Sequence, residues 1–348
     1  MRSLIKISVL ILIFLILISA GMTGCGKNEA RVAFFVYDEN DTFISEMMQS
    51  MSEMVPDEIR TEIRYAGNSQ VKQNQQIVEL TDTNIEIFVI NAVDRMACGS
   101  IAEKCITNDI NVIFFNREPL GDVMQNRNIY YVGSDADNEG KKQAQMAAEL
   151  FGEFKGSSYD KNKDGIIQVA VLKGEQGHQD AEKRTDNCIS MLRALGYEVE
   201  VLGIEAGNWS RDSGYESAKK LYTNYGNTIE LLFCNNDDMA VGAIRFLQEA
   251  GIFKEKARVF KDDEKKYDQP FLLISVDGTA VGLDAINRGL MYGTVLNDSA
   301  KQADAVMTLV EYILDKRDMS DFPYEILNAG YIFVDGDIIT MENLAEYL

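Results

Sequence analysis

Residues 85–94 read IEIFVINAVD, and residues 229–238 read IELLFCNNDD. Each stretch is a short, mostly apolar run that ends in asparagine and aspartate. Such a run is typical of a buried parallel strand with polar groups at its carboxyl end. Because one copy lies in each half of the chain, the pair predicts two domains of similar build. Ligands of such sheets bind outside the carboxyl ends of the strands, here at Asn91 and Asn236.

Outward from these two stretches, β-rich runs alternate with amphipathic segments along the whole chain. We expect strands at 31–36, 58–66, 85–91, 111–116, 166–172, 197–204, 229–235 and 271–277, and a return crossing between the domains at 331–334. Helical spacing falls near 43–54, 71–80, 96–106, 179–194, 211–224, 237–250, 280–288 and 298–315. The alternation predicts an α/β protein with two doubly wound, Rossmann-like parallel-sheet domains, and 348 residues suffice for both.

Composition and missing motifs exclude several classes of function. A formal net charge of −21 argues against binding to nucleic acid. The chain has no GxGxxG, no GxxxxGK[ST] and no GxSxG, and its one histidine, His178, cannot build a His-rich metal centre. We therefore expect no catalysis, with a glycosidase that uses two carboxylates as the enzymatic alternative. Four cysteines without CxxC spacing are expected to be buried free thiols: Cys98, Cys105, Cys188 and Cys234.

The first thirty residues have the pattern of an export signal. Arg2 and Lys6 precede an apolar run over 7–18, and small residues follow it up to Cys25. The sequence Met22-Thr23-Gly24-Cys25 is similar to a bacterial lipobox, in which the cysteine carries the lipid. We expect a lipoprotein signal over 1–24, a tether over 25–30 and a lipid-anchored protein outside the cytoplasm. An uncleaved anchor, or a cleaved signal followed by an ordinary cysteine, are the alternatives.

The segment DKNKDGIIQ at 160–168 follows the first nine positions of an EF-hand calcium loop. Side-chain oxygens occupy positions 1, 3, 5 and 9, glycine occupies position 6, and the carbonyl of Ile166 stands at position 7. Position 12 is Val171, where such loops carry a bidentate glutamate. The segment is therefore either a solvated turn or a structural calcium loop that a carboxylate from elsewhere completes.

A second group of polar residues suits the hydroxyl groups of a sugar. LKGEQGHQDAEKRT at 172–185 brings His178, Asp180 and Arg184 together after a strand. Other strand ends carry Asn91, Asn236, Asp277 and Asn297, and aromatic residues stand at Phe43 and Trp209. Planar amide, carboxylate and guanidinium groups bind adjacent hydroxyls, while aromatic rings cover the apolar face of a pyranose. The alternatives are a surface ion pair between Asp180 and Arg184, and ordinary helix caps at the strand ends.

Nine segments together resemble one known family. They are YDENDTF, INAVD, FFNREP, YYVGSD, DKNKDGIIQ, LKGEQGHQDAEKRT, NNDDMAVGA, SVDG and GTVLND. In these segments the chain resembles the periplasmic glucose/galactose-binding proteins of bacterial sugar importers, over roughly 31–340. The resemblance implies the type I periplasmic binding protein fold, with one domain at 31–112 and 298–330 and the other at 113–297 and 331–348. Hinge strands would lie near 110–116, 296–298 and 328–331.

The resemblance also assigns residues to ligands. It places hexose contacts at Asp41, Phe43, Asn91, His178, Asp180, Arg184, Trp209, Asn236, Asp277 and Asn297. It places a structural Ca²⁺ at Asp160, Asn162, Asp164, Ile166, Gln168 and the distant Glu230. The loop before Asp41 is longer than in the family, so Asp38 competes with Asp41 for that role. The charged segment 252–269 is foreign to the family pattern and could contact a partner.

Together, these expectations describe a protein that binds a sugar and does not transform it. The resemblance implies a carrier that binds D-galactose or D-glucose and delivers it to the membrane permease of an ABC-type importer. The alternative is a sugar receptor that signals to a chemoreceptor or a sensor kinase without transport. A monomer, anchored through the lipid on Cys25, fits either role.

Overall fold

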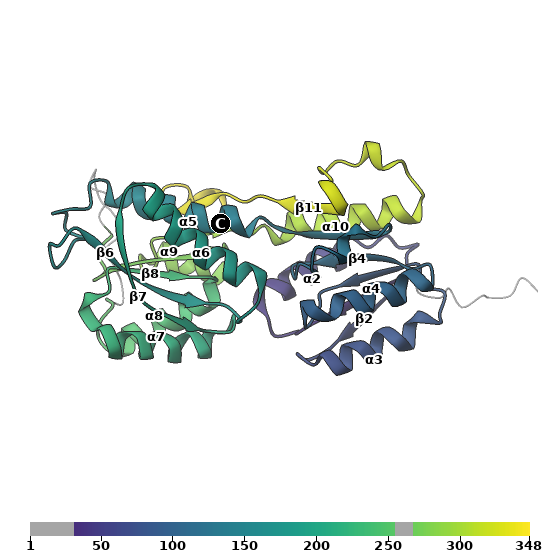
Figure 1. Cartoon of the computed structure of the whole chain (residues 1–348), viewed down its shortest axis with the longest axis horizontal. Coiled ribbons are helices and arrows are strands. Elements are labelled where there is room, and N and C mark those ends of the chain that lie inside the picture. Colours follow the sequence, from purple (N-terminus) through teal and green to yellow (C-terminus); the bar gives the residue numbers. More distant parts are fainter. Residues whose placement is uncertain (1–30, 255–266) are drawn as a thin grey trace, which may run out of the picture.

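The structure, a computed structural model, describes residues 31–254 and 267–348. It has two domains, each built on a six-stranded sheet with helices on both faces (Figure 1). The predicted α/β class with two doubly wound domains is confirmed. The expected signal segment, Cys25 and the tether lie outside the described residues. Within 31–254 and 267–348, no helix is long and apolar enough to cross a membrane.

The first domain has the strand order β11-β5-β4-β3-β1-β2, and all of its strand pairs are parallel. Helices α2 and α10 cover one face over a core that includes Phe34, while α3 and α4 cover the other over a core that includes Phe88. Its strands are β1 (Val32–Val36), β2 (Thr61–Tyr65), β3 (Ile87–Ile90), β4 (Asn111–Phe115), β5 (Ile129–Ser134) and β11 (Tyr331–Val334). Its helices are α2 (Thr42–Met54), α3 (Gln70–Thr81), α4 (Cys98–Thr107) and α10 (Ser299–Leu314).

The second domain repeats the arrangement as β12-β10-β9-β8-β6-β7, in which only β12 is antiparallel to its neighbour. Helices α5 and α6 pack over Val169 and Phe233 on one face, and α7, α8 and α9 pack over Leu232 on the other. The strands are β6 (Ile166–Lys173), β7 (Glu198–Ala206), β8 (Leu231–Cys234), β9 (Leu272–Asp277), β10 (Gly293–Leu296) and β12 (Ile338–Thr340). The helices are α5 (Ala136–Phe151), α6 (Gln179–Ala194), α7 (Arg211–Tyr225), α8 (Asp237–Glu249) and α9 (Ala280–Asn287).

The chain crosses between the domains at three places, two of which differ from expectation. Strands β5 and β11 both belong to the first sheet, so the crossings follow Ser134 and Val334. The expected domain boundaries at 112/113 and 330/331, and the hinges near 110–116 and 328–331, are therefore wrong. The expected crossing near 296–298 coincides with the passage from β10 to α10. The expected strands did not include β5, which pairs with β4 and extends the first domain to Ser134.

Helices begin directly after strands because polar residues at the strand ends cap them. Asp41 Oδ1 accepts a hydrogen bond from Ile44 N at 3.0 Å, and Asn236 Oδ1 accepts one from Met239 N at 3.0 Å. His178 caps α6 in the same way, with Nδ1 accepting from Asp180 N at 3.2 Å. Capping side chains satisfy free helix N–H groups, so they gather at the carboxyl edges of both sheets.

Two smaller expectations concern the cysteines and the 252–269 segment. All four cysteines are buried free thiols, as predicted. Residues 255–266 lie outside the described part of the chain. The described end of the segment is held in the second domain, because Tyr267 is buried and Gln269 Oε1 accepts a hydrogen bond from Lys254 N at 3.1 Å.

Candidate functional site

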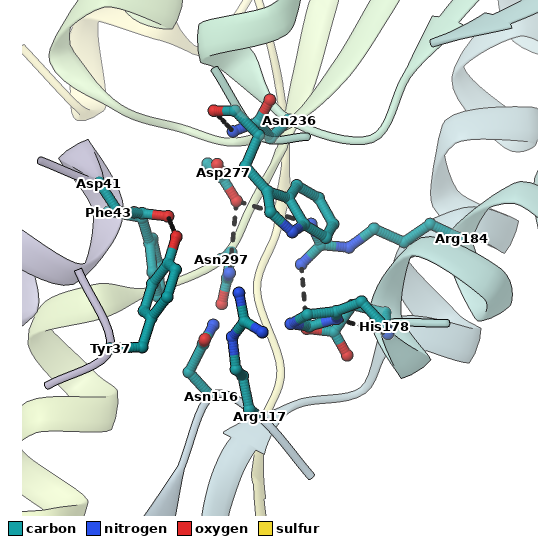
Figure 2. A pocket seen from close by; sticks show the side chains of 12 residues that line it. Tyr37, Asp41, Phe43, Asn116, Arg117, His178, Arg184, Asn236, Asp277 and Asn297 are labelled. Atoms are coloured by element: carbon teal, nitrogen blue, oxygen red, sulfur yellow. Dashed lines mark hydrogen bonds and ion pairs between the residues drawn. The ribbon is translucent and has the colours of Figure 1, made fainter. Parts of the chain in front are cut away.

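A pocket of about 350 Å³ lies between the two domains. Twelve side chains line it and point toward a common centre (Figure 2). They are Tyr37, Asp41, Phe43, Asn116, Arg117, His178, Asp180, Arg184, Trp209, Asn236, Asp277 and Asn297. Nine of the ten residues assigned to the ligand are therefore brought together, including Asp41 rather than Asp38.

The tenth assigned residue, Asn91, does not line the pocket. It follows β3, is fully buried, and donates from Nδ2 to Phe115 O at 3.2 Å and to Asn116 Oδ1 at 3.1 Å. Asn116, which follows the neighbouring strand β4, lines the pocket instead. Asn116 has a φ of 59°, in the left-handed region, where Asn is one of the few residues tolerated.

Tyr37, Asn116 and Arg117 are the lining residues that sequence reasoning missed. A signal was present, since FFNREP at 114–119 is a strand that ends in Asn and Arg at the same sheet edge. Tyr37 Oη donates to Asp41 Oδ2 at 2.6 Å, and the Arg117 guanidinium lies 4.1 Å from the centre of the Tyr37 ring. Arg117 Nη1 also donates to Val93 O at 2.7 Å, which fixes the side chain at the wall of the pocket.

On the second domain, Arg184 is the centre of a buried ionic network. Its Nε lies 2.6 Å from Glu139 Oε2, and its Nη1 donates to Asn235 O at 2.7 Å. Longer ion pairs reach Asp180 Oδ2 at 4.0 Å and Asp277 Oδ1 at 3.8 Å. Because Arg184 and the three carboxylates are all buried, the interaction is not the surface salt bridge that remained as an alternative.

The aromatic side of the pocket combines Trp209 with His178, whose rings lie edge to face with centroids 5.0 Å apart. A Cβ atom at Gly174 would lie 2.2 Å from Trp209 Cη2, so only glycine leaves room for the indole there. Trp209 itself has a φ of 62°, and its carbonyl accepts from Asn236 Nδ2 at 3.2 Å. Its Nε1–H is buried and has no hydrogen-bond partner in the described chain, which leaves one donor free for a ligand.

The position of the proton on the His178 ring follows from its role as the N-cap of α6. Its Nδ1 accepts a hydrogen bond from Asp180 N, so the remaining proton of a neutral ring lies on Nε2. Burial lowers the pKa of His178 well below its usual value, and the nearby charges of Arg117 and Arg184 lower it further. The ring is therefore a neutral donor at physiological pH.

The carboxyl groups of the pocket are perturbed in the opposite direction. Burial raises the pKa of Asp180 to about 7, although Arg184 opposes the shift. Burial also raises the pKa values of Asp41 and Asp277. Asp277 has a φ of 126°, a strained conformation for a residue with a side chain, and its Oδ1 accepts from Asn297 Nδ2 at 3.3 Å.

Four contacts join the two domains around the pocket. Arg117 Nη2 lies 2.8 Å from Glu175 Oε2, and Lys183 Nζ lies 3.2 Å from Glu118 Oε2. Thr42 Oγ1 donates to Asp238 Oδ2 at 2.7 Å, and Gln179 Nε2 donates to Asn116 O at 3.0 Å. These contacts define a closed arrangement in which the pocket is shielded from solvent.

The loop at 160–168 forms a separate polar site on the second domain. Its turns use left-handed φ values at Lys163 (64°) and Gly165 (78°). The buried Glu230 reaches it, with Oε1 accepting from Lys161 N at 2.6 Å and Oε2 accepting from Gln168 N at 3.1 Å.

The loop offers oxygen ligands for a hard cation, but too few of them are carboxylates to hold it alone. Two of them, Asp160 Oδ1 and Gln168 Oε1, are buried without a partner among the described residues. Nowhere in 31–254 and 267–348 do three His, Cys, Asp or Glu side chains gather closely enough to hold a metal ion. An ion at this loop would therefore need amide and main-chain oxygens as well as carboxylates, which is the donor chemistry that Ca²⁺ accepts.

Comparisons with known proteins agree with this geometry. The family described as periplasmic binding protein domain matches residues 32–318. The chain is 30% identical to the D-galactose/methyl-galactoside binding periplasmic protein MglB of Haemophilus influenzae over 95% of both chains. It is 22% identical to a xylitol-binding protein of Mycolicibacterium smegmatis, over 90% of this chain and 82% of that one.

Solved structures share the fold. An ABC transporter solute binding protein from Bacillus halodurans with bound myo-inositol superposes with a TM-score of 0.74 at 21% identity. The match covers 91% of this chain and 97% of that chain. A periplasmic solute binding protein from Actinobacillus succinogenes with bound D-allose gives a TM-score of 0.73 at 18% identity, over 92% and 100% of the two chains.

Proposed function

Because this chain belongs to the periplasmic binding protein domain family, we propose that it is an extracytoplasmic solute-binding protein for a monosaccharide, D-galactose or D-glucose. It would hand the sugar to the permease of an ABC-type importer and would not transform it. The observation that carries the proposal is the enclosed pocket, in which nine predicted residues and Asn116 converge from both domains.

The chemistry of the lining supports a polyhydroxylated ligand. Each sugar hydroxyl donates one hydrogen bond and accepts two, and the lining offers carboxylates, amides, two guanidinium groups and a neutral imidazole. Trp209 and Phe43 supply apolar surface for the ring of the sugar. The lining contains no serine, threonine or cysteine, so it offers no hydroxyl or thiol nucleophile of the kind that acyl-transfer enzymes use.

The mechanism is closure of two domains on the ligand. Three chain crossings join the domains, so a hinge motion at these segments can open the mouth of the pocket. Closure removes water from the hydrogen bonds of the sugar, and the side chains that Glu139, Gly174 and Asn91 hold in place limit the entropy lost on binding. The closed form would then be the one that the permease recognises.

Calorimetry with a set of sugars tests the proposal. We expect one-to-one binding of D-galactose or D-glucose, weaker binding of D-xylose, D-ribose, xylitol and myo-inositol, and a change in Trp209 fluorescence. Asp180→Ala should abolish the heat of binding. Asp318→Ala, which removes an exposed cap of a surface turn, should not. Folded protein that binds none of these compounds would refute the function, and loss of hexose uptake in cells lacking the gene separates transport from sensing.

We also propose that a structural Ca²⁺ is held by the loop at 160–168 together with Glu230. The ligands would be Asp160, Asn162, Asp164, the carbonyl of Ile166, Gln168 and Glu230. Support comes from the two buried oxygens without partners, Asp160 Oδ1 and Gln168 Oε1, and from the position of Glu230 against the loop. The ion would tie the start of β6 to the start of β8.

Lipid anchoring through Cys25 is a further part of the proposed function. It rests on the apolar run at 7–18 and on the sequence Met22-Thr23-Gly24-Cys25. Metabolic labelling with a palmitate analogue in cells should mark the protein, and Cys25→Ser should remove the label and release the protein from the membrane fraction. Labelling that persists in Cys25→Ser would contradict the assignment.

A further inference from the structure

Arg184 carries one positive charge, but three buried carboxylates surround it. Its guanidinium is shared among Glu139 at 2.6 Å, Asp277 at 3.8 Å and Asp180 at 4.0 Å. The side chains of all four residues are at most 6% exposed. Glu139 Oε1 has no hydrogen-bond partner within the described residues, so its charge is incompletely satisfied. One cation therefore faces three buried carboxylates, an arrangement that is unfavourable unless further positive charge arrives.

Three other cations around the pocket are paired with different carboxylates, and Arg95 donates to the carbonyl of Glu118. Arg117 pairs with Glu175, and Lys183 pairs with Glu118 at 3.2 Å and with Asp137 at 3.4 Å. At the mouth, Arg211 pairs with Asp238 at 2.8 Å. None of these three cations makes an ion pair within 4.0 Å with Asp180, Asp277 or Glu139 in the described chain.

The remaining titratable groups near the network do not supply a positive charge either. His178 is neutral, because burial and two arginines lower its pKa. Burial raises the pKa of Tyr131, whose hydroxyl donates to Asn116 O at 2.9 Å. Asp237 is stabilised by its own donors, from Ser275, Thr279 and Thr294. Asp41 adds a further carboxyl group from the first domain, capped by Ile44 N and Tyr37 Oη.

We propose that the closed site binds a monosaccharide together with one positive charge, which is a proton when the sugar is neutral and the ammonium group when the sugar is an aminohexose. The proposal rests on the proposed function and names its ligand class more closely. Glu139, which lies behind Arg184 and does not line the pocket, is the positioning residue that creates the excess of negative charge. The same excess rejects sugars that carry a carboxylate or a phosphate.

The direction of the pH dependence follows from closure. An aspartate in water has a pKa of about 3.9, whereas burial raises the pKa of Asp180 to about 7. The closed form therefore binds more protons than the open form between about pH 4 and pH 7. The affinity for a neutral hexose should fall as pH rises through this window, by at most about tenfold per pH unit per proton, and should level off above about pH 8. An aminohexose that remains protonated brings its own charge, so its affinity should stay flat over pH 5–7.

Calorimetry on the purified protein in two buffers of different ionisation enthalpy counts the protons directly. The ligands are D-galactose, D-glucose, D-galactosamine, D-glucosamine and D-galacturonate. At pH 6, we expect uptake of about one proton with the neutral hexose that binds and none with the corresponding aminohexose. Between pH 5 and pH 7, the ratio of aminohexose to hexose affinity should rise by roughly tenfold or more, and galacturonate should bind at least about a hundredfold more weakly than the hexose.

A matched pair of variants identifies the source of the charge. Glu139→Gln removes one buried carboxylate but keeps the shape of the side chain, so hexose binding should lose its proton uptake and its pH dependence. Glu86→Gln breaks an arginine–glutamate pair of the same Nε–O distance, 2.6 Å, which is exposed and lies at the amino end of β3. Glu86→Gln should leave both proton uptake and affinity unchanged.

The outcomes separate the two proposals. Hexose binding without proton uptake and without pH dependence would overturn the charge proposal and leave the proposed function standing. Failure of every monosaccharide to bind to folded protein would overturn both. If Glu139→Gln does not fold, the two-buffer measurement on the unaltered protein decides the question by itself.

Discussion

In the first domain the sheet runs β11-β5-β4-β3-β1-β2, and in the second it runs β12-β10-β9-β8-β6-β7, so one arrangement occurs twice. The two domains nevertheless equip the pocket differently. The second domain contributes His178, Asp180, Arg184, Trp209 and Asp277, and its arginine is bound to carboxylates of the same domain. The arginine of the first domain instead pairs with Glu175 across the mouth.

This difference assigns separate tasks to the two halves of the site. All ion pairs of the network around Arg184 lie within the second domain. The first domain carries Tyr37, Asp41, Asn116 and Arg117, and its ionic contacts at the mouth form only on closure. The second domain therefore holds the buried charges, and the first domain supplies partners for the ionic contacts that join the two domains.

Replacing Arg184 or Arg117 with methionine should give the largest difference in stability and in hexose binding between the two domains. Arg184→Met leaves three buried carboxylates without a cation, which should cost about 3–5 kcal/mol of stability and abolish detectable hexose binding. Arg117→Met breaks a pair whose Glu175 side chain is 44% exposed, and should cost below about 1 kcal/mol of stability. Thermal unfolding and calorimetry on both variants measure these effects. Equal loss of stability in the two variants would refute the assignment of separate tasks.

Trp209 and Phe43 should differ in whether their loss weakens sugar binding or lowers stability. Trp209 lies in a loop, so Trp209→Ala should weaken hexose binding by about 30- to 1000-fold, as for a buried aromatic anchor worth 2–4 kcal/mol, with a small change in stability. Phe43 belongs to the core of the first domain, where Phe43→Ala should cost about 3–5 kcal/mol. Chemical denaturation and sugar titration of both variants measure the two quantities. A Trp209→Ala protein that binds sugar normally would remove the indole from the site.

Sequence reasoning succeeded where one local pattern determined the residue. His178 caps α6, and Asp180 and Arg184 lie four residues apart on that helix, so their grouping follows from spacing alone. It failed at Asn91 because β3 and β4 both end in asparagine at the same edge of the sheet, and only tertiary packing decides which one reaches the pocket. Asn91 donates a hydrogen bond to Asn116, and Asn116 lines the pocket.

The charge balance of the site was also beyond the reach of the sequence. Glu139 lies 45 residues before Arg184 in the chain, on a helix that the pattern did not predict. Its contact with Arg184 depends on the packing of α5 against α6, with Gly140 directly against the backbone of Arg184. The displaced domain boundary has a different origin, because the expected strands did not include β5, which belongs to the first sheet.

Removal of calcium should affect the second domain alone. If the loop at 160–168 and Glu230 hold Ca²⁺, a chelator should lower the stability of the second domain by about 2–4 kcal/mol, the range for a ligand at 100 to 1,000 times its dissociation constant. The first domain has no part in this loop and should keep its stability. Amide hydrogen exchange with and without EGTA resolves the two domains. Glu230→Gln should reproduce the effect of the chelator, and unchanged protection of β6 and β8 would argue against the ion.

The smallest effect is expected from the contacts at the mouth. Glu175→Gln removes the partner of Arg117 only in the closed form, since the pair joins the two domains. The affinity for the hexose should fall by about two- to fivefold, as for a partly exposed ion pair, while the stability of each domain should not change. Because salt screens exposed charges, the difference between Glu175→Gln and the unaltered protein should shrink between about 0.01 M and 1 M salt. A Glu118→Gln variant, which breaks the other bridging pair and leaves the Lys183–Asp137 pair of the second domain in place, should behave in the same way. If either variant lowered the free energy of unfolding of a domain, the pair would stabilise that domain and not the closed arrangement of the two domains.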